Sequence, residues 1–221
     1  MKEGYFTPDS IGEQSRRMLE GLEGLRARHP VRFTPRRAAL LVLDMQRYFL
    51  DEDSHAFIPS APAIVPGIAA LADTFLMHDL PVVFTRHRNS EADAGMMADW
   101  WSDLISPESG LFEIVPELNR PAAMVIEKSQ YDAFHETELD GMLREAGIEQ
   151  LVITGVMTHL CCETTARSAF MRGFAVFFPV DGSATYREDF HRAALLNLSH
   201  GFAVPVLVDD LIASIGERDR A

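Results

Sequence analysis

The chain is poor in several kinds of residue, and each scarcity excludes a class of protein. It has two cysteines in 221 residues, and because Cys161 and Cys162 are adjacent they cannot form a disulfide framework. No apolar run approaches the roughly 18 residues of a transmembrane helix. Lysine and arginine number 20 against 33 acidic residues, and the net charge of −13 argues against nucleic acid or an anionic membrane surface as a partner.

The first residues of the chain also lack the apolar core of a signal peptide. Together with the cysteine usage, this predicts a cytoplasmic protein. Apolar residues, in contrast, make up 47% of the composition, which is enough for a substantial core. We expect an N-terminal helical extension over residues 1–36 and one domain over residues 37–221, because this length fits a single α/β domain.

Short apolar runs alternate with helical stretches through the rest of the chain. The predicted strands lie at residues 38–44, 81–85, 122–127, 150–155, 174–180 and 202–206. The predicted helices lie at residues 8–28, 64–77, 136–146, 161–172, 188–199 and 209–215. This βαβα order predicts an α/β protein with a three-layer α/β/α, Rossmann-like fold and a central, mostly parallel six-stranded sheet. Residues 88–118 form a long irregular connection, which is more often functional than idle.

Cys161 stands at a predicted strand-to-helix junction. A thiol in that position lies among unpaired backbone N–H groups and near the positive end of the helix dipole, and both favour the nucleophilic thiolate. Cys161 is therefore a candidate nucleophile. The alternative is a buried structural thiol, because free cysteine is among the most buried residue types.

Two charged residues end other predicted strands. Asp44 ends the first strand, and Lys128 follows the third. In open parallel sheets the functional residues gather beyond the carboxyl ends of the strands, so Asp44, Lys128 and Cys161 are expected to converge. Taken singly, Asp44 could cap a turn and Lys128 could be a solvated edge residue.

Three segments resemble the motifs of the isochorismatase-like hydrolases, a family that includes cysteine hydrolases. They are Asp-Met-Gln-Arg-Tyr-Phe at 44–49, Glu-Lys-Ser-Gln-Tyr-Asp-Ala-Phe at 127–134 and Gly-Val-Met-Thr-His-Leu-Cys-Cys-Glu-Thr-Thr-Ala at 155–166. The resemblance implies that Asp44 and Lys128 are catalytic and that Cys161 is the nucleophile. It also implies a cis peptide bond before Met157, and an oxyanion hole formed by the N–H groups of Met157 and Cys161.

The same resemblance implies a small-molecule substrate and a homo-oligomer, either a dimer or a tetramer. Family members act on nicotinamide, ureido compounds, carbamoyl amines and isochorismate. The residues expected to bind substrate are Phe49, His87, Trp101, Tyr131 and Val156. Trp100 is an alternative to Trp101 as the residue that covers the site.

Other polar residues near the motifs are expected to have no part in the chemistry. Cys162 lies roughly 100° around the helix from Cys161, which predicts a core position, and His159 is expected to point away. Asp51, Asp53 and His55 match poorly the Asp-x-His element of metal-dependent nicotinamidases in this family. Neither a metal nor another cofactor is therefore expected.

Three functions remain open on these grounds. The first is a thiol-dependent amidohydrolase that cleaves a C–N bond of a small amide, carbamoyl or ureido compound through a thioester. The second is an isochorismatase, which hydrolyses a vinyl ether without a cysteine nucleophile, and such members usually carry glycine at the position of Cys161. The third is a non-catalytic binding protein, which would be expected to lack at least one of Asp44, Lys128 and Cys161.

Overall fold

A computed structural model describes residues 2–101 and 103–216, so the last residues of the predicted domain, 217–221, lie outside the described residues. It contains a central seven-stranded sheet in the order β3-β2-β1-β4-β5-β7, with β6 paired to β4. The strands are β1 (Ala38–Leu43), β2 (Val82–His87), β3 (Met124–Lys128), β4 (Gln150–Val156), β5 (Ala175–Pro179), β6 (Ser183–Ala184) and β7 (Ala203–Val206). All pairings among these strands are parallel.

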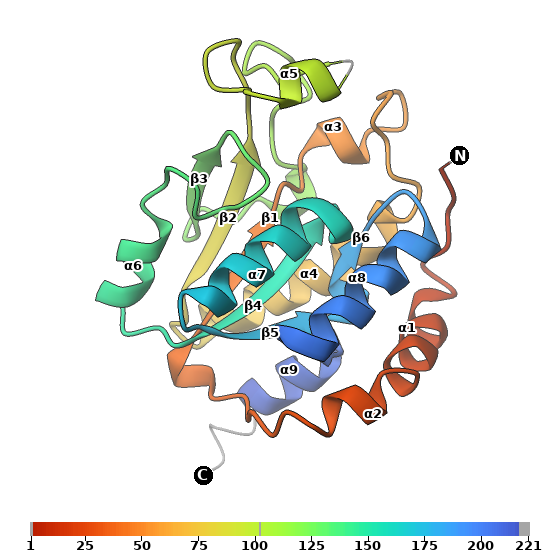
Figure 1. Cartoon of the computed structure of the whole chain (residues 1–221), viewed down its shortest axis with the longest axis vertical. Coiled ribbons are helices and arrows are strands. Elements are labelled where there is room, and N and C mark those ends of the chain that lie inside the picture. Colours follow the sequence, from red (N-terminus) through yellow and green to blue (C-terminus); the bar gives the residue numbers. More distant parts are fainter. Residues whose placement is uncertain (1, 102, 217–221) are drawn as a thin grey trace.

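Helices cover both faces of the sheet, with α7 and α8 in front of it and α4 behind it in Figure 1. The α-helices are α1 (Ile11–Glu20), α2 (Glu23–Arg26), α3 (Arg47–Leu50), α4 (Ala61–Met77), α5 (Met97–Trp100), α6 (Leu139–Glu145), α7 (Glu163–Met171), α8 (Glu188–Gly201) and α9 (Val208–Gly216). The short turns are the 3₁₀ turns Pro35–Arg37, Pro116–Leu118 and Val180–Gly182, and the π-helical turn Thr158–Cys162. The predicted α/β fold is confirmed.

Two details differ from the prediction. The sheet has a seventh strand, β6, whose two residues are too few to give an apolar run that could be recognised in the sequence. The single helix expected over residues 8–28 is divided into α1 and α2 by a turn at Gly21 and Leu22, where Leu22 is buried. Ahead of α1, Tyr5 and Phe6 are also buried in the core.

The strand order reverses between β1 and β4, which are neighbours in the sheet although β2 and β3 separate them in the sequence. All six residues of β1 are buried, as expected for a central parallel strand covered on both faces. In an open α/β sheet, the crevice at such a reversal is where ligands bind. The segments that follow β1 and β4 contain Asp44 and Cys161 respectively.

Gly155 allows β1 and β4 to approach closely at this point. Its φ is +109°, and a Cβ at this position would lie 2.1 Å from the carbonyl oxygen of Leu43. Only glycine avoids that contact and adopts such a φ without cost. Gly155 thereby sets the residue after β1, Asp44, beside the turn that follows β4.

Candidate active site

Four side chains meet beyond the carboxyl ends of neighbouring strands. Asp44 follows β1, His87 ends β2, Lys128 ends β3, and Cys161 lies in the π-helical turn after β4. His87 and Lys128 are register partners in the sheet. The three residues predicted to converge, Asp44, Lys128 and Cys161, do so.

Asp44 is held in place by Thr85 of β2. The Asp44 N–H donates to Thr85 Oγ1 at 3.1 Å, and the Thr85 hydroxyl donates to Asp44 Oδ1 at 2.6 Å. Asp44 has a φ of +53°, in the left-handed region that aspartate tolerates better than most residues. These two bonds fix the carboxylate and leave Oδ2 to face Lys128.

Lys128 forms a fully buried ion pair with Asp44, with Nζ 2.7 Å from Oδ2. Burial alone would raise the pKa of Asp44, but the Lys128 ammonium, with help from the Thr85 hydroxyl, holds it below its usual value. Burial opposes the charge on Lys128 as well, yet Asp44 and Cys161 raise its pKa. Both groups are therefore charged at neutral pH.

Cys161 Sγ lies 3.4 Å from Lys128 Nζ, and 6% of the residue is exposed. Burial raises the pKa of the Cys161 thiol to about 12, with Lys128 opposing this rise and Asp44 adding to it. Cys161 is therefore a thiol at neutral pH, although its position after a strand and before a helix favours the thiolate. The reason is that Asp44 already neutralises the ammonium, so a thiolate would be a second buried anion beside one cation.

Three of these side chains carry atoms of the kinds that bind metal ions: Asp44, His87 and Cys161. Those atoms lie within 4.8 Å of one another. The Lys128 ammonium contacts all three residues, at 2.7, 3.1 and 3.4 Å. The positive charge among these ligand atoms is thus supplied by a side chain. The residues compared with a metal element in the sequence are not part of this group. Asp51 pairs with Arg47, and His55 Nε2 is 3.2 Å from the Tyr48 hydroxyl.

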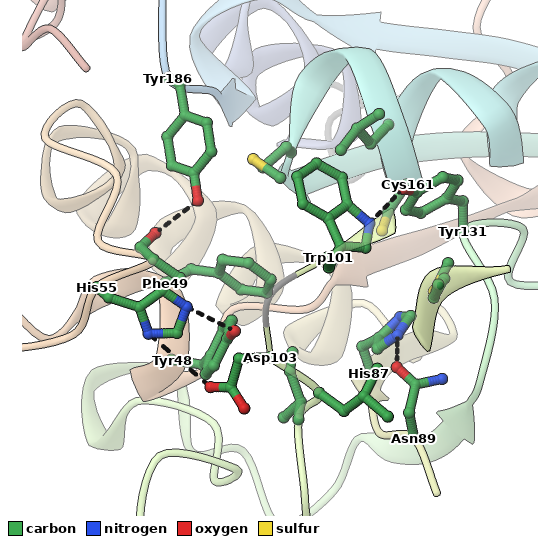
Figure 2. A pocket seen from close by; sticks show the side chains of 16 residues that line it. Tyr48, Phe49, His55, His87, Asn89, Trp101, Asp103, Tyr131, Cys161 and Tyr186 are labelled. Carbon is green, nitrogen blue, oxygen red and sulfur yellow. Dashed lines mark hydrogen bonds and ion pairs between the residues drawn. The ribbon is translucent and has the colours of Figure 1, made fainter. Parts of the chain in front are cut away.

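A cavity of about 240 Å³ opens beside Cys161 (Figure 2). Its walls consist of Tyr48, Phe49, His55, Ala56, His87, Asn89, Met97, Trp101, Asp103, Leu104, Ile105, Tyr131, Met157, Leu160, Cys161 and Tyr186. Four residues expected to bind substrate, Phe49, His87, Trp101 and Tyr131, are therefore in its wall. Val156, the fifth, is fully buried in β4 and is not part of the wall.

The long connection between β2 and β3 supplies one side of this cavity. Trp101 Nε1 donates to the Tyr131 hydroxyl at 2.8 Å, and this pair lies close to Cys161 in Figure 2. Trp101 is 38% exposed, whereas Trp100 is 74% exposed and lies outside the cavity wall. Of the two tryptophans, Trp101 is thus the one that covers the site.

Several wall residues were not expected from the sequence to bind substrate. Tyr48, His55 and Asp103 come together only in the fold, with His55 Nδ1 3.9 Å from the Asp103 carboxylate. Asn89 is hydrogen-bonded to His87, and Tyr186 follows β6. The position of Asn89, two residues after the end of a strand, was the one clue available, because polar residues at strand ends face this crevice.

The remaining predictions concern the neighbours of Cys161. The Val156–Met157 peptide bond is cis, and Met157 and Cys161 both line the cavity. Cys162 is fully buried with its Sγ 3.8 Å from the Thr154 carbonyl oxygen, which confirms its core position. His159 is hydrogen-bonded to Thr185 and is not part of the cavity wall.

Comparison with known proteins places the chain among hydrolases. The Isochorismatase domain model matches residues 38–210. Nicotinamidase 3 of Arabidopsis thaliana is 39% identical over 183 residues, which are 80% of this chain and 88% of that protein. Isochorismatase of Bacillus subtilis (strain 168) is 33% identical over 187 residues, 80% of this chain but 58% of the longer relative.

The fold also matches the crystal structure of a cysteine hydrolase from Pseudomonas syringae pv. phaseolicola 1448A. The TM-score is 0.80 at 24% sequence identity, covering 84% of this chain and 95% of that one. The family model and the Arabidopsis thaliana relative show that the protein is a hydrolytic enzyme. The chain belongs to the isochorismatase family.

Proposed function

We propose that the protein is a cysteine amidohydrolase that cleaves the C–N bond of a small amide, carbamoyl or ureido compound. The observation that carries this proposal is the contact of Cys161 Sγ with the Lys128 ammonium, at 3.4 Å, in the wall of the cavity. The same ammonium holds the Asp44 carboxylate at 2.7 Å. A nucleophile, a base and a fixed positive charge thus stand within reach of one bound substrate.

In the first half of the proposed reaction, Asp44 takes the proton of the Cys161 thiol as the sulfur attacks the carbonyl carbon. A resting thiol with a pKa of about 12 requires this base, because the thiolate fraction at neutral pH is minute. The Met157 and Cys161 N–H groups stabilise the developing oxyanion, a role typically worth about 3 kcal/mol per donor. Asp44 then protonates the leaving amine, and the thioester remains.

In the second half, Asp44 accepts a proton from water as the water attacks the thioester carbon. The C–S bond breaks, the sulfur recovers a proton from Asp44, and the acid departs. Lys128 keeps its proton throughout, and this chemistry requires no cofactor.

The cavity wall favours a planar, uncharged substrate. Aromatic side chains form much of it, including Phe49, Trp101 and Tyr131, and such rings pack on flat apolar groups. Because Nicotinamidase 3 is a relative, nicotinamide is the first aromatic amide to test.

The second candidate is an isochorismatase, which the Bacillus subtilis relative suggests. Two observations weigh against it. Protonation of a vinyl ether needs a carboxylic acid, yet Lys128 keeps the pKa of Asp44 low and the group ionised. Isochorismate also carries two carboxylates, whereas the described residues of the cavity wall include no lysine or arginine.

The test is a turnover assay of nicotinamide, benzamide, N-carbamoyl amines, ureides and isochorismate with wild type and Cys161→Ala. We expect wild type to hydrolyse at least one amide or ureide, and Cys161→Ala to lose that activity by several orders of magnitude. Intact-mass measurement after rapid acid quench should show the acyl group on wild type and not on Cys161→Ala. Retained isochorismate turnover in Cys161→Ala, with loss in Asp44→Ala, would establish the second candidate instead.

A further inference from the structure

The Lys128 ammonium has more hydrogen-bond acceptors around it than it has hydrogens. Its Nζ lies 2.7 Å from Asp44 Oδ2, 3.0 Å from the Gln130 carbonyl oxygen, 3.1 Å from His87 Nδ1 and 3.4 Å from Cys161 Sγ. An ammonium donates three hydrogens, so these four acceptors compete for them. The group is fully buried, so the described residues must satisfy it.

The two longest contacts of Lys128 Nζ are those to His87 and to Cys161, and these two acceptors compete for the same hydrogen. A protonated thiol is a weak acceptor, whereas a neutral imidazole nitrogen is a good one. In the resting enzyme the third hydrogen therefore goes to His87 Nδ1. A sulfur that has lost its proton would be the better acceptor and would draw this hydrogen away from the imidazole.

A chain of hydrogen bonds fixes the tautomer that lets His87 accept. Asn89 Nδ2 donates to the Ser129 carbonyl oxygen at 2.7 Å, so Asn89 Oδ1 faces the imidazole. That oxygen lies 2.7 Å from His87 Nε2 and accepts its hydrogen. Nδ1 is then left bare and directed at Lys128.

The surroundings of His87 also keep it neutral. Burial and the adjacent Lys128 ammonium lower its pKa to about 4, against opposing effects of Asp44, Asn89 and Asp93. The imidazole is thus an acceptor without charge over the range in which the enzyme would operate. It contrasts with Asp44, the charged acceptor of the same ammonium.

We propose that His87 is a positioning residue for Lys128: its neutral imidazole holds one ammonium hydrogen in the resting enzyme and yields it to Cys161 Sγ when the thiol is deprotonated. No proton is transferred in this exchange, because Lys128 remains an ammonium and the thiol proton goes to Asp44. The inference rests on the proposed role of Cys161 as nucleophile. The expectation that His87 binds substrate stays a prediction beside it.

Removal of the imidazole acceptor should change the thiol before any substrate binds. In His87→Met, Lys128 has three acceptors for three hydrogens, and one hydrogen is committed to Cys161 Sγ. The thiol pKa should fall, and a fall of one unit multiplies the thiolate fraction tenfold. Because nucleophilicity falls with basicity, alkylation should then accelerate by about threefold.

The experiment is the rate of Cys161 alkylation by iodoacetamide between pH 6 and pH 10, read by peptide mapping. His87→Met should react at least about threefold faster than wild type at pH 8, and its kcat should fall at an unchanged KM. His87→Gln offers an amide oxygen to Lys128 and should restore much of the wild-type profile. Asn89→Leu removes the acceptor that keeps the hydrogen of His87 on Nε2. It should shift the alkylation profile in the same direction as His87→Met.

His159→Gln is the matched control, since this histidine is hydrogen-bonded to Thr185 and is not part of the cavity wall. It should leave alkylation and turnover unchanged. An alkylation profile of folded His87→Met that coincides with wild type would overturn the inference, and so would a raised KM with unchanged kcat. Failure of the proposed function would appear differently, as Cys161→Ala that still turns over amides.

Discussion

At the scale of single residues, the buried Lys128 ammonium contacts two acidic groups, a carboxylate and a thiol. Lys128 contacts the Asp44 carboxylate at 2.7 Å and the Cys161 sulfur at 3.4 Å, and only one of these acids is ionised in the resting enzyme. The carboxylate takes the charge because its intrinsic pKa is several units lower than that of a thiol. The thiol is consequently protonated at neutral pH, beside an ionised carboxylate that shares its cation.

Substitution of Asp44 and substitution of Lys128 should shift the pKa of the Cys161 thiol in opposite directions. Asp44→Asn removes the competing anion, so the pKa of Cys161 should fall, whereas Lys128→Met removes the cation, so it should rise. Both variants should lose most turnover, because the first has no base and the second has an unpaired buried carboxylate.

The pH profile of iodoacetamide labelling measures both shifts. Cys162 should remain unlabelled in each variant, because it is fully buried. Circular dichroism verifies that the variants are folded. Equal labelling profiles of Asp44→Asn and wild type would contradict the shared-cation account.

At the scale of secondary-structure elements, the site depends on how closely β1 and β4 lie. Gly155 of β4 is the register partner of Leu43 of β1, the residue before Asp44. A methyl group at Gly155 would have to displace β1 backbone atoms, since its nearest neighbours are the oxygen, nitrogen and carbon of Leu43.

Gly155→Ala should therefore be far more damaging than an alanine at another left-handed glycine. We expect a loss of more than about 4 kcal/mol of unfolding free energy, or failure to fold, because the clash adds to the cost of φ +109°. Gly147→Ala is the control: its φ is +68° and no heavy atom lies within 4 Å of the added methyl, so only about 1–2 kcal/mol should be lost. Urea unfolding measures both, and similar losses would contradict the explanation.

At the scale of the whole molecule, two buried histidines make stability depend on pH. Burial, then Lys128, lowers the pKa of His87 to about 4, and burial lowers that of His191 to about 3. His191 of α8 has its Nδ1 at 3.0 Å from the Thr158 hydroxyl, in the π-helical turn that contains Cys161. Both imidazoles are neutral in the folded protein at pH values where they are protonated in the unfolded chain.

The unfolding free energy should fall as the pH is lowered from about 6.5 to about 4. In this window the two histidines bind two more protons in the unfolded state than in the native state, and each contributes about 1.4 kcal/mol per pH unit. Asp181 offsets one of them below about pH 6, because burial raises its pKa to about 6 and it binds a proton in the native state. Above pH 7 neither histidine contributes a slope. His191→Gln removes one histidine and should reduce the slope by about 1.4 kcal/mol per pH unit. Urea unfolding at pH 7, 6 and 5 provides the measurement, and an unchanged slope in His191→Gln would refute the assignment.

The helices of the outer surface are relevant to membrane insertion and to self-association. In the part of the chain that the structure describes, no helix is both long and apolar enough to cross a membrane. Exposed apolar side chains occur on α7 and α8, where Phe170, Met171 and Leu196 are 49%, 81% and 54% exposed. Self-association as a dimer or tetramer stays a prediction, as do the cytoplasmic location and the boundary at residue 37.

The sequence by itself determined the sheet and the residues that converge at its edge. Buried parallel strands need continuous apolar runs, and those runs end where Asp44, Lys128 and Cys161 stand. Convergence of the three could be predicted because the carboxyl ends of parallel strands share one edge. The pattern is local, so neighbouring residues were sufficient to reveal it.

Only the tertiary structure decided the ionisation of the thiol and the shape of the cavity. The pKa of Cys161 depends on its burial and on the charges of Lys128 and Asp44. Burial and these charges both come from groups that are distant in the sequence. The cavity wall likewise draws Tyr48, Asn89, Asp103 and Tyr186 from separate irregular segments that carry no periodic pattern. Sequence periodicity reports which face of an element is buried, whereas electrostatics and cavities depend on distances between elements, and folding alone sets those distances.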